Sequence, residues 1–258
     1  MISAVIVTYN EANNEAKTLK NCLSSITGYV DEIVVVDLGS NDDSVKIAKQ
    51  YQAKIFTHKK VDFVEKVRDF AVSKAQGDWI LVLDPDEIIT PTLWKKFKEI
   101  ASEGKFEAVN IPRKNIFFGR FIKHTNWWPD NHVRFFKNGS VKWNDKIHVY
   151  PKVYGRVLDL PAIEDLAIIH RGYDSIQQFI DRQNRYSSVE ADNLYNEGGR
   201  FSWTSFFWWP AREFLVRFIK HQGFLDGFYG FSLTYLMMVY KIMVLVKLWE
   251  RGKERREE

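Results

Sequence analysis

The stretch that most constrains the fold of this chain is an apolar run that ends in carboxylates. Trp79 to Leu83 are five consecutive apolar residues, which predicts a strand buried on both faces of a sheet. Asp84, Asp86 and Glu87 follow directly. Open α/β sheets bind ligands at the carboxyl ends of parallel strands, and hard oxygen donors there suit Mg²⁺ or Mn²⁺. The alternative is structural, because Asp86 or Thr90 can cap the helix that follows.

Strands and helices alternate before this run. The predicted strands are Ile2 to Thr8, Glu32 to Asp37 and Lys54 to Thr57. A helix is expected after each one, and these helices end near Ile26, Gln52 and Gln76. The alternation predicts an α/β fold with a mostly parallel sheet and helices on both faces. The first strand-to-helix turn has no glycine, which excludes the G-x-G-x-x-G site of NAD-dependent enzymes.

After the helix that begins at Pro91 the pattern changes to short strands. We predict them at Phe106 to Ile111, Val133 to Phe136 and Val141 to Trp143, with a hairpin turn over residues 137–140. Residues 115–129 between the first two are aromatic and basic. They are either a flap that packs on the core or a surface that binds an acceptor or a membrane.

The carboxyl third is helical and aromatic. A polar helix is expected over Ser175 to Asn196, and apolar residues dominate after Gly199. Phe228 to Leu248 is long enough to span a bilayer, but Lys241 lies in its middle, which costs about 2.5 to 3.5 kcal/mol on insertion scales. We therefore expect helices that lie in the membrane interface or are buried in a homo-oligomer, with a true span as the alternative.

Composition limits the remaining choices. The net charge of +4 is modest and does not call for a nucleic-acid partner. A single cysteine, Cys22, excludes a disulfide framework and fits a reducing compartment. Residues 1–5 resemble a first strand more than a signal peptide, so we expect the catalytic part to be cytoplasmic.

Three motifs occur together in a characteristic order. They are Val7 to Glu11, Asp37 to Asp42 and Leu83 to Glu87, and each follows a predicted strand. In this order and spacing they resemble family 2 glycosyltransferases of the GT-A fold. A closer resemblance is to bacterial lipopolysaccharide-core glycosyltransferases of the KdtX/WaaE type. It is carried by Asp130 with Val133-Arg134-Phe135-Phe136, by Ile169 to Tyr173, and by Gly223 to Gly227.

The resemblance implies a fold and a domain plan. The GT-A fold is the Rossmann-like fold of nucleotide-diphospho-sugar transferases. We expect a catalytic domain over residues 1–174, in which residues 1–90 bind the nucleotide and residues 91–174 bind the acceptor. Residues 175–258 are expected to form a C-terminal helical, aromatic-rich region that associates with a membrane or with other subunits.

The resemblance also implies an activity. It is the inverting, metal-dependent transfer of a sugar from a nucleoside diphosphate, with UDP preferred, to a lipid-linked or lipopolysaccharide-core acceptor. The place would be the cytoplasmic face of the inner membrane, with peripheral or monotopic attachment. Two alternatives stay open: a catalytically silent, membrane-associated binding module, and a polyprenyl-phosphate glycosyltransferase.

Site residues follow from the matched motifs. In the family the first aspartate of the Asp-x-Asp pair approaches the ribose and the second holds the metal, which implies these roles for Asp84 and Asp86. His170 matches a histidine that completes the metal site or contacts the diphosphate, although a lone histidine is often structural. Asp37 can accept from a uracil-type imide, or it can be a turn residue. The expected nucleotide-sugar site comprises Thr8, Tyr9, Asn10, Glu11, Asp37, Ser40, Asp42, Lys66, Arg68 and Asp84.

Two departures from the family matter. The family often has Arg-Asn where this chain has Arg68-Asp69, so Arg68 has a neighbouring carboxylate as an alternative partner. The lipopolysaccharide-type relatives carry a His-Glu pair where this chain has His148-Val149, and so the usual glutamate is missing. Three residues are candidates for the catalytic base. In order of preference they are Asp130, His148 and Asp145. Desolvation by the Trp-Trp-Pro segment before Asp130 would raise the pKa of its carboxyl; the alternative is that Asp130 is a turn carboxylate.

Overall fold

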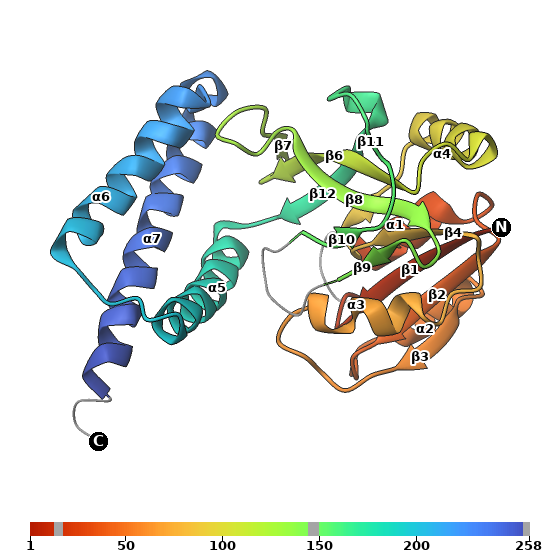
Figure 1. The fold of residues 1–258 in the computed structure, drawn as a ribbon, viewed down its shortest axis with the longest axis horizontal. Helices are drawn as coiled ribbons and strands as arrows, with labels where there is room; N and C mark the ends of the chain where they lie inside the picture. The colour runs from red at the N-terminus through yellow and green to blue at the C-terminus, as the bar shows by residue number, and fades with distance from the viewer. Residues whose placement is uncertain (13–17, 144–149, 255–258) are drawn as a thin grey trace. The chain divides into compact units, whose positions relative to one another are not determined.

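The structure of the chain is a computed structural model that describes residues 1–12, 18–143 and 150–254 (Figure 1). It divides into two compact units. The first, here called the sheet unit, comprises Met1–Lys114 and Pro129–Gly172. The second, here called the helical unit, comprises Asn115–Trp128 and Tyr173–Glu258. The aromatic and basic segment around residues 115–128 therefore belongs with the C-terminal helices.

The first four long strands form the parallel half of the sheet. They stand in the order β3-β2-β1-β4 and every neighbouring pair is parallel. All residues of β1, β2 and β4 are buried, as their continuous apolar runs predict. Their carboxyl ends therefore meet at one edge. The bounds are β1 (Ile2–Thr8), β2 (Glu32–Asp37), β3 (Lys54–Thr57) and β4 (Trp79–Leu83).

Helices cover both faces of this half, as expected. The first core cluster contains the apolar faces of α1 (Thr18–Ile26), α2 (Ser44–Gln50) and α4 (Pro91–Glu103). The second contains that of α3 (Glu65–Val72). Helix α4 begins at the expected cap, because the Thr90 hydroxyl accepts the backbone N–H of Leu93.

Beyond β4 the sheet becomes largely antiparallel. Strand β8 (Asp130–Lys137) pairs antiparallel with β4 on one side and with β6 (Ala108–Phe117) on the other. The sheet continues to β12 (Ile168–Tyr173) and β5 (Glu87–Ile88), which pair antiparallel with each other. Beside β6 lie β7 (Arg120–Phe121), antiparallel, and β11 (Val157–Asp159), parallel. A short helix, η1 (Glu164–Leu166), precedes β12.

The hairpin predicted over residues 137–140 is wrong. The turn exists, since the Ser140 N–H donates to the Lys137 carbonyl at 3.0 Å. However, β9 (Val141–Lys142) pairs with β10 (Lys152–Val153) in a separate two-stranded sheet. The reason is that β8 is apolar on both faces: Phe135 packs in the first core cluster and Phe136 in the second. Such a strand is stable in the middle of the main sheet, between two other strands.

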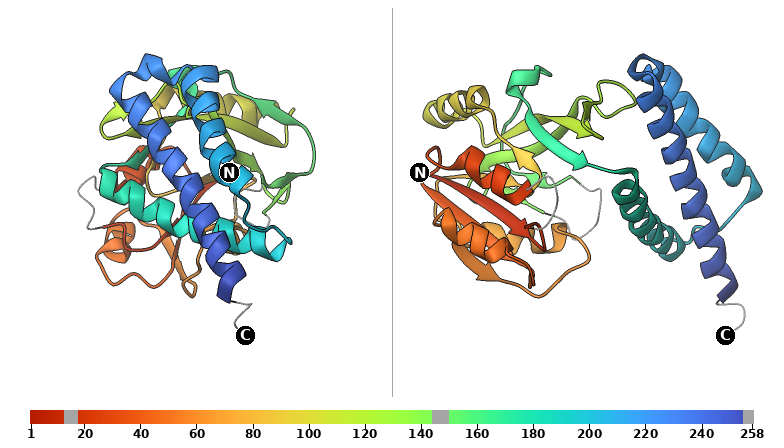
Figure 2. Two further views of the ribbon diagram at one scale, coloured as in Figure 1. Left: turned by 90° about the vertical axis from the view of Figure 1, so that its left-hand side faces the viewer. Right: turned by 180° about the vertical axis from the view of Figure 1, so that it is seen from behind.

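The helical unit consists of three long helices and two short turns. They are α5 (Ile176–Asn196), α6 (Trp203–Phe214), η2 (Leu215–Lys220), η3 (Gly223–Asp226) and α7 (Phe228–Glu254). Helix α7 packs against both α5 and α6 (Figure 2). Its buried residues include Leu233, Met237 and Val244. The long polar helix expected over residues 175–196 is confirmed as α5.

Polar contacts join α5 to α7 along its C-terminal half. The Lys241 ammonium, expected to be the obstacle to a membrane span, lies 2.8 Å from Glu190 of α5. Lys247 donates to Asn184 at 2.7 Å, and Arg251 lies 2.7 Å from Asp192. One side of α7 therefore contacts the polar helix α5.

Candidate active site

The loops after β1 and β2 are tied together at the carboxyl edge of the sheet. The Asn10 N–H donates to Ser40 Oγ at 2.9 Å, and the Asn41 N–H donates to Asn10 Oδ1 at 2.9 Å. Asn10 has a left-handed backbone with φ of 55°, which asparagine tolerates better than most residues. Two of the residues expected to bind a nucleotide sugar, Asn10 and Ser40, are thus brought into contact.

Asp37 and Asp42 organise these same loops. Asp37 is 5% exposed and accepts the N–H groups of Gly39 and Ser40, each at 3.1 Å. Asp42 accepts the N–H of Ala12 at 2.8 Å and that of Ser44 at 2.9 Å. The turn role considered for Asp37 is therefore present, and Asp42 makes contacts of the same kind. A carboxylate has about four lone-pair sites, so the contacts of Asp37 leave room for a ligand that donates a hydrogen bond.

The other residues of the first loop present a hydroxyl and a ring. Thr8 is 1% exposed, and its Oγ1 makes no hydrogen bond within the described residues. The Lys60 ammonium lies 4.1 Å from the centre of the Tyr9 ring, a cation–π contact that sequence reasoning missed. Glu11 accepts a hydrogen bond from the Thr18 hydroxyl at 3.0 Å. Tyr9 and Glu11 thus offer aromatic and polar surface at the edge of the sheet, whereas the Thr8 hydroxyl at the end of β1 is buried.

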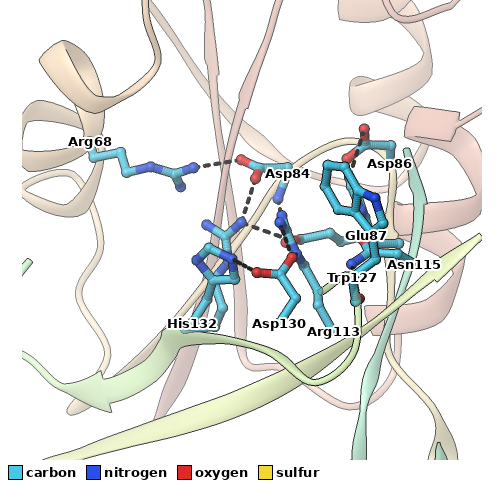
Figure 3. Close-up of polar contacts among 11 residues, drawn as sticks. Arg68, Asp84, Asp86, Glu87, Arg113, Asn115, Trp127, Asp130 and His132 are labelled. Atoms are coloured by element: carbon cyan, nitrogen blue, oxygen red, sulfur yellow. Dashed lines mark hydrogen bonds and ion pairs between the residues drawn. The ribbon is translucent and has the colours of Figure 1, made fainter. Parts of the chain in front are cut away.

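Asp84, directly after β4, is held between two guanidinium groups (Figure 3). Arg68 of α3 donates to its Oδ1 at 2.7 Å, and Arg134 of β8 donates to its Oδ2 at 2.5 Å. Burial alone would raise the pKa of Asp84, but Arg134 and Arg68 outweigh burial and hold it well below its usual value. Asp84 is therefore ionised at neutral pH. Arg68 pairs with a carboxylate, as the departure at Asp69 suggested.

Glu87 extends this network inward. It is fully buried, accepts the backbone N–H of Asp84 at 2.9 Å, and lies 2.8 Å from Arg134 and 3.4 Å from Arg113. Arg113 of β6 in turn donates to Asp130 from Nη2 at 2.5 Å and from Nε at 2.9 Å. Three arginines and three carboxylates therefore alternate in one continuous series. Burying these charges is tolerable only because each one has partners.

A bulge in β8 places Arg134 at the centre of this series. Val109 of β6 faces Phe135, but the next residue, Asn110, faces Val133. Arg134 is thus the extra residue of a β-bulge, a feature that re-aims a side chain and is common beside active sites. From the sequence, Arg134 is apparent only as part of a motif, and no role for Glu87 or Arg113 can be predicted.

Asp130, the first candidate for the catalytic base, has the opposite pKa shift from the one expected. Burial does raise its pKa, but the hydrogen bond with His132 and the charge of Arg113 outweigh burial and lower the pKa far below the usual value. His132 Nε2 lies 3.0 Å from Asp130 Oδ1. The expected rise in pKa was wrong because the expectation rested on the preceding Trp-Trp-Pro segment alone. It left out the charge of Arg113, which lies on the neighbouring strand β6.

The two residues expected to hold a metal lie side by side. His170 Nε2 is 3.5 Å from Asp86 Oδ2, because β12 pairs with β5 and sets His170 opposite Glu87. The Arg171 N–H donates to the Asp86 carbonyl at 2.9 Å, which fixes the loop. Within the described ranges, no group of three or more His, Cys, Asp and Glu is arranged to hold an ion by itself. Mg²⁺ is commonly bound through one or two carboxylates, with water and phosphate completing its shell, so Asp86 fits this role and His170 lies within reach as a further ligand.

The remaining expected residues lie elsewhere or outside the described chain. Lys66 is on α3 and pairs with Asp62 at 3.2 Å. Asp69, where the family often has asparagine, accepts the backbone N–H of Trp143 at 3.0 Å and so fixes the end of β9. Asp145 and His148, the other base candidates, lie outside the described residues, as does Val149.

Comparison with known proteins gives consistent results. A family model described as glycosyl transferase family 2 matches residues 3–155. An uncharacterized glycosyltransferase of Rickettsia felis is 29% identical over 270 residues, covering 96% of this chain and 89% of the relative. The mannosyltransferase PcManGT of Pyrobaculum calidifontis, solved with GDP-Man and Mn²⁺, is 15% identical, with a TM-score of 0.52 over 96% of this chain and 86% of its own. TarS 1-349 of S. aureus, solved with UDP-GlcNAc, is 16% identical, with a TM-score of 0.50 over 75% of this chain and 66% of its own.

Proposed function

Because this chain belongs to glycosyl transferase family 2 and is a transferase of the GT-A fold, we propose that it is an inverting, metal-dependent enzyme that uses a nucleoside diphosphate sugar, with UDP as the preferred nucleotide. The single observation that carries this proposal is the contact between Asp86 and His170. Asp86 lies two residues after Asp84, which is ionised. The two solved relatives are described with GDP-Man and UDP-GlcNAc, so the nucleotide itself is a proposal.

In this proposal the donor lies along the carboxyl edge of the parallel strands. The joined loops at Asn10 and Ser40 receive the base, Asp37 accepts from its imide, and Asp84 faces the ribose. Arg68 faces the diphosphate. This role is supported by its Nη1, which is buried and makes no hydrogen bond within the described residues. A buried donor without a partner is costly, and a phosphate oxygen would remove that cost.

Asp86 and His170 would hold Mg²⁺ or Mn²⁺. When bound, the ion supplies positive charge against the diphosphate as it leaves. Asp84 is the weaker metal ligand in this arrangement, because Arg68 and Arg134 already offset its negative charge. The division of roles between Asp84 and Asp86 is therefore supported by the contacts of Asp84.

We propose that the acceptor is lipid-linked or a lipopolysaccharide core, as in enzymes of the KdtX/WaaE type, at the cytoplasmic face of the inner membrane. The support is the apolar surface of the helical unit, where Phe228 is 80% exposed, Trp203 69% and Phe207 68%. Large exposed aromatic groups beside basic residues suit the headgroup region of a bilayer. The alternative is that a homo-oligomer covers this apolar surface.

Attachment is proposed to be peripheral or monotopic. Among the described residues, one helix, over Phe228–Lys253, is long and apolar enough to cross a bilayer. Spanning would carry Glu190, Asp192 and Asn184 of α5 into hydrocarbon with it, or would break their contacts with α7. Either outcome is costly, which favours a helix that lies in the interface.

The test is a screen of UDP-sugars and GDP-sugars with and without Mn²⁺, reading release of the nucleoside diphosphate. Asp86→Asn should abolish metal-dependent release and metal-dependent binding of UDP, measured by calorimetry. Asp165→Asn is the matched control, because Asp165 is an exposed carboxylate of the same unit. Unchanged metal-dependent UDP affinity in Asp86→Asn would contradict the assignment.

The same screen separates the alternatives. A chain that binds UDP with Mn²⁺ but turns over no donor supports the catalytically silent module. Turnover that is stimulated only by a polyprenyl phosphate supports a polyprenyl-phosphate glycosyltransferase.

A further inference from the structure

We propose that His132 is the catalytic base, and that Asp130 is the residue that positions it. The inference rests on the proposed function and fills the place left by the missing glutamate at Val149. It assigns Asp130 a positioning role in place of the base role expected from the sequence.

The geometry of the pair fixes the state of the imidazole. Asp130 and His132 are two residues apart on β8, and His132 Nε2 lies 3.0 Å from Asp130 Oδ1. The other oxygen of Asp130, Oδ2, is held by Arg113. Ionised Asp130 can only accept, so Nε2 must be the nitrogen that carries the proton. Nδ1 is then the nitrogen with a lone pair to receive one.

The accepting nitrogen is open to a substrate. The His132 side chain is 32% exposed, and Nδ1 makes no hydrogen bond to any part of the chain that the structure describes. The Tyr150 ring lies beside it with centroids 6.4 Å apart, and this tyrosine is 70% exposed. Within the described residues, an acceptor hydroxyl can therefore approach Nδ1 without displacing a partner.

Burial, together with the charges of Arg113 and Arg134, keeps the imidazole neutral. Among the described residues, four groups face it: Asp130 and Arg134 of β8, Arg113 of β6, and Tyr150. Burial lowers the pKa of His132, and the charges of Arg113 and Arg134 lower it further, against the opposing hydrogen bond of Asp130. At neutral pH His132 is thus ready to accept a proton. Asp130 is a poor acceptor by comparison, since its pKa is far below the usual value.

The contacts also fix the position of His132 relative to the proposed site of the nucleotide sugar. From Asp130 the series runs through Arg113, Glu87 and Arg134 to Asp84 (Figure 3). A base held by such a rigid series stays in register with the carboxylate that we assign to the ribose.

The proposed step balances as a single displacement. The acceptor oxygen forms a bond to the anomeric carbon while the bond from that carbon to the diphosphate oxygen breaks, and its electron pair leaves with the diphosphate. The acceptor proton moves to His132 Nδ1. The resulting imidazolium is stabilised by Asp130 and returns its proton to water after the product leaves.

The experiment uses donor hydrolysis by the full chain, because water attacking the anomeric carbon must lose a proton in the same way. The donor is the best one found in the screen, with Mn²⁺. His132→Gln should lower kcat by about 100-fold or more while leaving UDP affinity unchanged, as expected for loss of a general base. The acidic limb of the pH profile should disappear with it. His221→Gln is the control, since His221 lies in the helical unit.

Two further variants separate positioning from catalysis. Asp130→Asn should cause a smaller loss and should move the acidic limb to lower pH, because the Asp130 hydrogen bond raises the pKa of His132. His132→Ala should regain activity when free imidazole is added, which a purely structural role would not produce.

Three results would overturn the inference. Full activity of His132→Gln with an unchanged pH profile removes His132 from the reaction. Complete loss in Asp130→Asn at every pH, with activity retained in His132→Gln, makes Asp130 the base. Absence of hydrolysis by the parent with every donor overturns the proposed function, and this assignment falls with it.

Discussion

Replacing Arg134 with methionine tests whether the alternating series of charges holds the site together. Arg134 is 5% exposed and bonds to both Asp84 and Glu87. Removing one partner of a buried ion pair costs about 3 to 5 kcal/mol, because a charge is left without compensation. Asp84 keeps Arg68, and Glu87 keeps Arg113 and the Asp84 N–H. We therefore expect the lower end, about 3 kcal/mol.

The assay is thermal unfolding. For a domain of this size about 3 kcal/mol corresponds to a fall of about 6 to 12 °C in the midpoint. Because the chain has two units, the relevant transition is the one that UDP and Mn²⁺ shift upward, since a ligand stabilises only the unit that binds it. Lys137→Met is the control on the same strand. Its partner Glu107 lies 3.2 Å away at the surface, and its loss should cost at most about 1 kcal/mol.

A second substitution sharpens this prediction. Glu87→Gln should destabilise the parent but stabilise Arg134→Met, because in that variant the buried carboxylate has lost its best partner. The reasoning is refuted if Arg134→Met costs less than about 1 kcal/mol. It is also refuted if Glu87→Gln destabilises both backgrounds equally.

Three more outcomes follow from the contacts. The folded-state pKa of Asp130 is lowered, so its stabilisation is present at neutral pH and is lost progressively as the pH falls from about 4 toward the lowered folded-state pKa; the difference in unfolding free energy between the parent and Asp130→Asn, measured by urea titration, should shrink over this range. The triple variant Trp203→Ser, Phe207→Ser, Phe228→Ser should lose sedimentation with anionic vesicles but keep UDP affinity, whereas Ile163→Ser in the sheet unit should change neither. Gly230→Ala should unfold the helical unit at lower temperature, because a Cβ there would lie 1.8 Å from the Gly223 carbonyl oxygen; an unchanged near-UV circular dichroism melt would contradict this.

The sequence predicted the parts of the fold that depend on local pattern. Continuous apolar runs identified β1, β2 and β4, and their carboxyl ends are where the expected nucleotide loops meet. The Asp86–His170 contact followed from resemblance to a family, not from spacing, since 84 positions separate the two residues. The errors arose where a partner lies far along the chain.

The hairpin and the pKa of Asp130 illustrate this limit. A turn signal at residues 137–140 reports a turn but not which strand β8 will pair with. The Trp-Trp-Pro segment indicates burial, yet the charge that decides the pKa of Asp130 comes from Arg113 on another strand. The role of Arg134 was equally hidden, because it depends on sheet order and on a bulge that brings it to Asp84, 50 residues away.

The bulge at Arg134 divides β8 into two segments, of which one packs in the core and the other contributes to the site. On one side, Phe135 and Phe136 fill the two cores and are constrained by volume. On the other side, Asp130 and His132 carry polar groups and are constrained by what they contact. Since Val133 already pairs with Asn110 and Phe135 with Val109, deleting Arg134 would remove the bulge and leave both segments opposite the same residues of β6. The strand therefore allows its chemistry to diversify without redesign of its core.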